Sequence, residues 1–225
     1  MTNEEIPEAL EDDIDKALEE HGCAKVKLNS DEIDGFYYGF SNRTIWPLFH
    51  YFLKYSEFEL NYWDTYKAVN QKFADAIIEN SSEDDTIWVH DYQLMLVPQM
   101  VREKRPDTTI GFFLHIPFPS FEIFRTLPWR EEILEGLLGS DLIGFHTYDY
   151  ERHFLSSVRR LIGLDVSFNE IYLDNRVIKV DSFPMGIDYK KFRDAAVLHD
   201  TKSEDERSDL QIRLDNHRTP SSLYP

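Results

Sequence analysis

The chain has 225 residues, of which 42% are hydrophobic and 14% aromatic, enough to build one α/β domain with a core. Its formal net charge of −18 disfavours binding to nucleic acid and to anionic membranes, both of which attract basic proteins. The single cysteine, Cys23, excludes an internal disulfide and favours a reducing compartment. We therefore expect a cytoplasmic protein without nucleic-acid or membrane partners.

Residues 1–34 are strongly acidic and are predicted to form a helix followed by a short strand. Apolar residues recur at helical spacing over residues 2–21, and Gly22 is suited to end that helix. A strand is expected at Ala24–Leu28. The acidic side chains are interpreted as the solvated face of the helix.

Residues 35–192 alternate helices with short apolar strands. The strands are predicted at residues 86–89, 109–114 and 142–145, and the helices at residues 61–79, 93–104, 122–138 and 149–161. Apolar strands that alternate with helices are typical of a parallel sheet. The predicted fold is therefore α/β, a Rossmann-like parallel sheet with helices on both faces. A hairpin that turns at Asp174–Asn175 follows, and residues 193–225 are predicted to be a polar tail.

Each of the three predicted strands is followed by a histidine: His90, His115 and His146. In an open parallel sheet, ligands bind beyond the carboxyl ends of the strands, so these side chains are expected to line one crevice. A lone histidine is more often structural, but three at equivalent positions favour a functional site. The spacing does not indicate a metal site, and the sequence contains neither G-x-G-x-x-G nor a phosphate-loop motif. No metal and no cofactor are predicted.

Asp91 follows the first of these histidines and has two interpretations. Its carboxylate could accept a hydrogen bond from a sugar hydroxyl, or it could cap the helix that begins near Tyr92. His115 lies in the segment His115–Pro119, where two prolines stiffen the loop and suit a positioned catalytic group. The same prolines could simply mark a turn.

The segment Tyr37–Pro47 is rich in aromatic and hydrogen-bonding side chains. Aromatic faces stack on the apolar faces of sugar rings, so Tyr37 and Trp46 are candidates for sugar binding. The competing interpretation, which the residues alone favour, places both side chains in the core.

Five segments resemble, in the same order, motifs of the trehalose-6-phosphate synthase family. They are Gly39–Tyr51 (GFSNRTIWPLFHY), Val89–Leu94 (VHDYQL), Gly111–Pro119 (GFFLHIPFP), Asp141–Thr147 (DLIGFHT) and Phe183–Asp188 (FPMGID). The resemblance covers residues 35–192, and it is highly specific because several long motifs follow one another in order.

The resemblance implies the N-terminal, acceptor-side half of a two-domain GT-B glycosyltransferase, with the active site in the cleft between the domains. Family members transfer glucose from UDP-glucose to glucose 6-phosphate with retention, giving trehalose 6-phosphate, and use no metal. By this resemblance Tyr37, Trp46 and Asp91 match acceptor-binding positions, which overturns the core interpretation of the two aromatic residues. His115 matches the residue that contacts the donor glucose. Asp91 and His115 are therefore the expected catalytic residues.

The resemblance also implies that the chain is incomplete. Nothing before residue 35 matches the opening strand and glycine-rich loop of the family, and the chain stops short of the second domain, whose basic residues neutralise the donor pyrophosphate. Removing one electrostatic donor of this kind typically costs ~10²–10³ in rate. We therefore expect a partial domain that is inactive alone, needs the missing C-terminal GT-B domain and self-associates through an exposed sheet edge.

Two hypotheses stay open at this point. The chain is either part of an active synthase or a noncatalytic regulatory or interaction module derived from one. The presence of all four candidate residues favours the first, because a purely scaffolding role does not need them.

Overall fold

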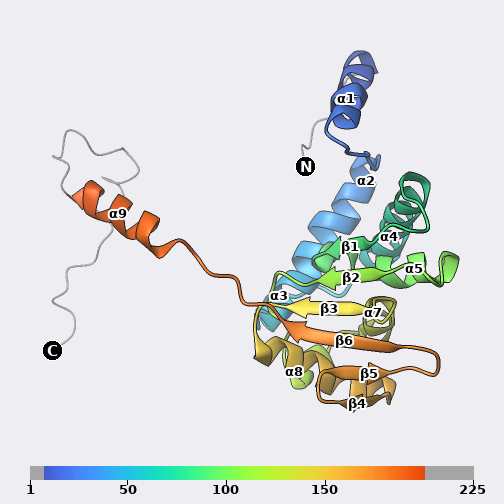
Figure 1. Cartoon of the computed structure of the whole chain (residues 1–225), viewed down its shortest axis with the longest axis vertical. Helices are drawn as coiled ribbons and strands as arrows, with labels where there is room; N and C mark the ends of the chain where they lie inside the picture. The colour runs from blue at the N-terminus through green and yellow to red at the C-terminus, as the bar shows by residue number, and fades with distance from the viewer. Residues whose placement is uncertain (1–7, 201–225) are drawn as a thin grey trace. The chain divides into compact units, whose positions relative to one another are not determined.

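The computed structural model describes residues 8–200 (Figure 1). The chain divides into two compact units, Met1–Pro184 and Met185–Pro225. The first unit contains one six-stranded sheet with its helices, and the second contains the helix α9 (Tyr189–Asp200). The predicted polar tail therefore begins within a helix, and its remainder, residues 201–225, lies outside the described part.

The sheet has the strand order β1-β2-β3-β6-β5-β4. Its strands are β1 (Ile87–His90), β2 (Ile110–Phe113), β3 (Leu142–Phe145), β4 (Asp165–Ser167), β5 (Glu170–Tyr172) and β6 (Val177–Ser182). The first three strands and β6 are parallel, whereas β5 and β4 are antiparallel additions. The three predicted parallel strands and the hairpin turn at Asp174–Asn175 are thereby confirmed. A second turn, at Phe168–Asn169, was not predicted.

Twelve helical segments are described in the first unit. They are α1 (Glu8–Glu20), α2 (Ser30–Glu32), η1 (Ile33–Ile45), α3 (Trp46–Phe49), η2 (Leu53–Tyr55), α4 (Leu60–Asn80), η3 (Tyr92–Leu94), α5 (Val97–Lys104), α6 (Phe121–Phe124), α7 (Arg130–Leu137), α8 (Tyr148–Ser157) and η4 (Val158–Ile162). All the helices predicted between residues 61 and 161 are present, although two are divided near a proline, Pro98 or Pro128. No helix in the described part is long and apolar enough to cross a membrane.

The segment after α1 differs from the prediction. Gly22 ends α1 as expected, with a φ of +64° and the N–H of Cys23 bonded to the Leu18 carbonyl at 2.8 Å. The strand predicted at Ala24–Leu28 does not form, and none of the six strands of the sheet pairs with this segment. An isolated strand would leave its backbone N–H and C=O groups without hydrogen-bond partners. Residues 2–7 of the predicted helix lie outside the described part.

The core lies on one face of the sheet, against which α5 and α8 pack, and α4 and α7 pack in turn on α5. On that face Val89, Phe112 and Ile143 are buried in a single apolar cluster. On the opposite face Trp88 is 49% exposed. The α/β fold with a parallel sheet is confirmed, and the helices of the described residues cover one of its two faces.

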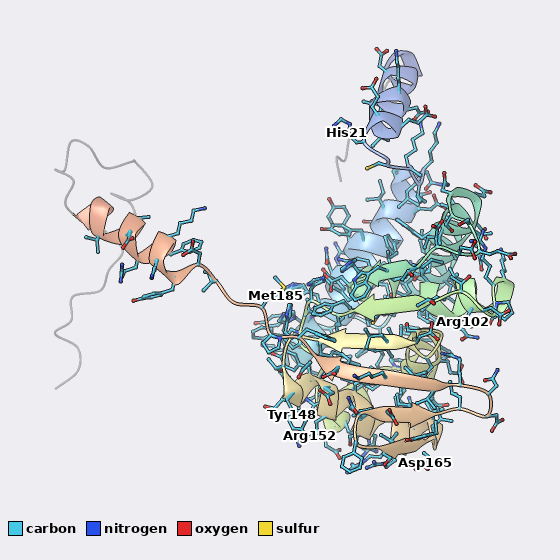
Figure 2. All side chains as sticks on the ribbon, viewed as in Figure 1. His21, Arg102, Tyr148, Arg152, Asp165 and Met185 are labelled. Carbon is cyan, nitrogen blue, oxygen red and sulfur yellow. The ribbon has the colours of Figure 1, made fainter. Side chains whose placement is uncertain are left out.

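Arg102 and Asp141 join the elements at the amino-terminal ends of the strands. The Asp141 carboxylate accepts hydrogen bonds from the backbone N–H of Ile110 and from the Arg102 guanidinium, both at 2.7 Å. Arg102 also donates to the carbonyls of Gly139 and Thr108. Figure 2 shows Arg102 at the end of the sheet where β2 begins. This one side chain thus connects α5 with the starts of β2 and β3.

We expect Arg102→Met to lower the free energy of unfolding by about 2 kcal/mol, because it leaves several carbonyls and a carboxylate without their donor. Urea denaturation followed by circular dichroism measures the change. Lys104→Met is the matched control, since the Lys104–Asp75 ion pair is exposed and should contribute less than about 1 kcal/mol. Equal losses in the two variants would contradict the anchoring role of Arg102.

Candidate functional site

The loop after β1 holds Asp91 in a strained backbone conformation. Its φ is +72°, in a region that few non-glycine residues adopt and that costs about 1–3 kcal/mol. The Asp91 N–H donates to the Phe113 carbonyl at 2.8 Å, and the Asp91 carboxylate accepts the backbone N–H of His115 at 3.1 Å. The carboxylate makes no capping bond to the following helix η3, so the helix-cap interpretation of Asp91 is wrong. Both bonds instead fasten Asp91 to the end of β2.

The three strand-ending histidines converge, as predicted. His90 Nδ1 lies 2.9 Å from His115 Nε2, and the rings of His115 and His146 have centroids 5.5 Å apart. Burial lowers the pKa of His90, and the neighbouring His115 lowers it further, while Asp91 acts in the opposite direction. Within residues 8–200, no three histidine, cysteine or carboxylate side chains are grouped to hold a metal ion.

Two buried polar residues of α4 fix the turn that follows Asp91. The Tyr66 hydroxyl donates to the Tyr92 carbonyl at 2.8 Å and accepts the N–H of Met95 at 3.1 Å. Asn70 accepts the N–H of Leu96 at 3.2 Å. Burial raises the pKa of Tyr66, so this hydroxyl keeps the proton that it donates. The turn that follows Asp91 is therefore held by two side chains from α4, the helix that precedes β1.

Tyr92 links this turn to η1, the helix that carries Tyr37. Its hydroxyl donates to Asn42 Oδ1 at 2.9 Å. Burial raises the pKa of Tyr92 to about 12, and the charges of Asp91 and Tyr37 contribute to the shift. The hydrogen bond to Asn42 thus joins the turn after Asp91 to the helix that carries Tyr37.

Trp46 lies at the start of α3 and is 37% exposed, so the core interpretation of this residue is wrong. It lines a pocket of about 330 Å³ together with Asn42, Pro47, Phe52 and Tyr55. Tyr37 is half-buried, packs against the core and meets the ring of Tyr38 edge-on. Trp46 therefore presents an accessible aromatic surface, whereas Tyr37 is partly in the core.

The structure connects the four predicted residues to different degrees. The Asp91 carboxylate accepts a hydrogen bond from the backbone N–H of His115, and Tyr37 lies on η1, the helix that Tyr92 reaches through Asn42. Trp46 shares a pocket with Asn42, which accepts the Tyr92 hydroxyl.

Sequence reasoning missed the supporting residues Asn42, Tyr66, Asn70 and Tyr92. One feature of the sequence could have indicated them. Asn70 is a polar residue one helical turn after Tyr66, on the buried side of the same helix. A buried amide requires hydrogen-bond partners, and here they belong to the loop that follows β1.

A larger hollow of about 820 Å³ lies along α8, and Figure 2 labels two of its lining residues, Tyr148 and Arg152. None of the four candidate residues lines it. Its charged lining is balanced between three arginines and three carboxylates, namely Arg152, Arg159, Arg160, Glu122, Glu151 and Asp181. Size alone does not make this hollow the functional site, because its charges do not favour any one class of ligand.

We expect Tyr66→Phe to lower the free energy of unfolding by about 1–3 kcal/mol, because it leaves the Tyr92 carbonyl and the Met95 N–H buried without a partner. Denaturant titration measures the loss. Tyr55→Phe, which removes the hydroxyl of a side chain that is 67% exposed, is the matched control and should change stability by less than about 0.5 kcal/mol. Indistinguishable stabilities of the two variants would contradict the role given to Tyr66.

Comparisons with known proteins agree on one family. The model of glycosyltransferase family 20 matches residues 1–218. A UDP-forming alpha,alpha-trehalose-phosphate synthase of Schizosaccharomyces pombe is 48% identical over 197 residues, which are 85% of this chain and 38% of that protein.

Solved structures give the same result. A UDP-forming trehalose-phosphate synthase from Burkholderia xenovorans superposes with a TM-score of 0.72 at 34% identity, over 85% of this chain and 42% of that one. A structure of such a synthase from the same organism in complex with glucose 6-phosphate has a TM-score of 0.67 at 32% identity, over 76% and 39% of the two chains.

The chain spans between 25% and 41% of the length of the curated relatives that it matches best. The family model nevertheless covers nearly all of it, since the match runs from residue 1 to residue 218. This chain belongs to glycosyltransferase family 20.

Proposed function

We propose that this chain contributes the acceptor-side region of an alpha,alpha-trehalose-phosphate synthase that acts in trehalose biosynthesis. The reaction transfers glucose from UDP-glucose to glucose 6-phosphate with retention and yields trehalose 6-phosphate and UDP. The observation that carries this proposal is the bond between the Asp91 carboxylate and the His115 N–H, at the carboxyl ends of neighbouring parallel strands. It is supported by a relative named as a UDP-forming synthase and by a similar structure that holds glucose 6-phosphate.

Asp91 is the proposed acceptor for a hydroxyl of glucose 6-phosphate. A carboxylate has two oxygens, and Oδ1 accepts the His115 N–H, so Oδ2 is suited to a sugar hydroxyl. The backbone of Asp91 is already fixed by its bond to Phe113. Little ordering is then required when the sugar binds, which favours both affinity and orientation.

Tyr37 and Trp46 are the proposed aromatic contacts of the same sugar. The accessible ring of Trp46 is suited to stacking on the apolar face of a hexose. Tyr37 lies on the neighbouring helix η1, which the Tyr92 hydroxyl joins to the turn after Asp91. Together these residues would hold the acceptor beside the carboxylate.

His115 is the proposed contact of the donor glucose. In the proposed chemistry, the acceptor hydroxyl oxygen bonds to the anomeric carbon on the face from which UDP departs. The bond to the UDP oxygen breaks, and the hydroxyl proton passes to that departing oxygen. The side chains of this chain therefore bind and orient the two sugars, and none of them forms a covalent bond to a sugar.

We further propose that the donor pyrophosphate is bound by a second, C-terminal GT-B domain that is not among these 225 residues. The share of the relatives' length that the chain covers supports this proposal. Self-association is proposed through β1, which lies at the edge of the sheet and carries the exposed side chain of Trp88. A cytoplasmic location is proposed because Cys23 is the single cysteine.

We expect the purified chain to bind glucose 6-phosphate in calorimetry and to form no trehalose 6-phosphate from UDP-glucose and glucose 6-phosphate. Asp91→Asn should weaken glucose 6-phosphate binding by about tenfold or more, because it removes a charged hydrogen-bond acceptor. Asp165→Asn is the matched control, since Asp165 is exposed at the start of β4, at the opposite edge of the sheet from β1.

Three outcomes would change this view. Product formation that Asp91→Asn abolishes would show that the chain is catalytically complete. Equal affinity of the two variants for glucose 6-phosphate would contradict the acceptor role of Asp91. No binding of glucose 6-phosphate by the unchanged chain would favour a noncatalytic interaction module.

A further inference from the structure

The histidine cluster contains a direct hydrogen bond between two rings. His90 Nδ1 and His115 Nε2 are 2.9 Å apart, and the rings lie nearly parallel, 19° from each other, with centroids separated by 5.2 Å. One hydrogen must lie between two nitrogens at this distance, because two facing lone pairs or two facing N–H groups would repel. One ring is therefore the donor and the other the acceptor.

The surroundings of the pair decide which ring donates. Burial and the adjacent His115 both lower the pKa of His90, while Asp91 only partly opposes them. These surroundings therefore disfavour the positively charged form of His90. We therefore assign His115 Nε2–H as the donor and Nδ1 of the uncharged His90 ring as the acceptor of the 2.9 Å hydrogen bond.

Other groups hold His115 on its remaining sides. The rings of Phe113 and His146 have centroids 4.7 Å and 5.5 Å from that of His115. The backbone N–H of His115 is bonded to Asp91 Oδ1. In the described part of the chain, Nε2 is the ring nitrogen of His115 that has a hydrogen-bond partner, which leaves Nδ1 for a ligand in the crevice.

We propose that His90 is a positioning residue, which accepts a hydrogen bond from His115 Nε2–H and so directs Nδ1 of His115 toward a hydroxyl of the donor sugar. His90 acts only through His115 and does not touch the sugar itself. The contact with the donor rests on the function proposed above, whereas the bond between the two histidines does not.

Nuclear magnetic resonance of the chain labelled with ¹⁵N-histidine tests the bond without any substrate. We expect a scalar coupling across the hydrogen bond between His115 Nε2 and His90 Nδ1. His90→Phe should abolish the coupling and speed the exchange of the Nε2 hydrogen with water by about fivefold or more. His90→Asn offers a side-chain oxygen as acceptor and should keep the exchange close to that of the unchanged chain.

The two variants separate positioning from packing. If His90 only filled space, the ring of His90→Phe would preserve slow exchange and His90→Asn would not, which is the reverse of our expectation. Absence of the coupling in the unchanged chain would also overturn the proposal.

Titration with UDP-glucose to saturating concentration, which offsets the pyrophosphate contacts assigned to the second domain, then tests the ligand contact. We expect the His115 Nδ1 resonance to shift in the unchanged chain and in His90→Asn, and to shift less in His90→Phe. A shift of equal size in all three proteins would overturn the positioning role while leaving the donor contact intact. A coupling without any response to UDP-glucose would overturn the donor contact proposed for His115 and leave the bond between the histidines standing.

Discussion

The buried hydroxyl of Tyr66 is the interaction on which the arrangement of the candidate site depends. It satisfies one carbonyl and one N–H of the turn that follows Asp91, and both would otherwise be buried without partners. The same turn carries Tyr92, whose hydroxyl reaches η1. Helix α4, helix η1 and the loop after β1 are thereby joined into one unit, although they come from separate parts of the chain.

The sheet itself is held at both ends by polar contacts. At the amino-terminal ends of the strands, Arg102 and Asp141 join β2 and β3 to α5. At the carboxyl ends, the bonds of Asp91 and the contacts between histidines join β1 to β2 and β3. Four-residue strands are only about 13 Å long, so each end limits the movement of the other. A short, doubly fastened sheet is a suitable support for side chains that must keep fixed relative positions.

Much of this arrangement follows from local sequence patterns. The parallel strands, the helices between them and the convergence of His90, His115 and His146 all follow from periodicity and from the geometry of parallel sheets. The short strand expected at Ala24–Leu28 does not form, because a strand depends on a partner that local pattern cannot supply. The hydrogen bond between the Asp91 carboxylate and the His115 N–H could not be predicted from the sequence either. It depends on a positive φ at Asp91, which the sequence does not indicate. Tertiary contacts of this kind decide which of several polar groups in a loop become neighbours.

The left-handed backbone of Asp91 has a consequence for the evolution of the protein. Glycine adopts a φ of +72° without strain, so the backbone conformation alone would favour Gly over Asp at this position. A glycine would lack the carboxylate that fastens the next loop. If variants were selected only for heat resistance, without a test of sugar binding, we would therefore expect replacements of Asp91 by glycine to accumulate. Its persistence in a natural sequence would be a sign that function, rather than folding, maintains it.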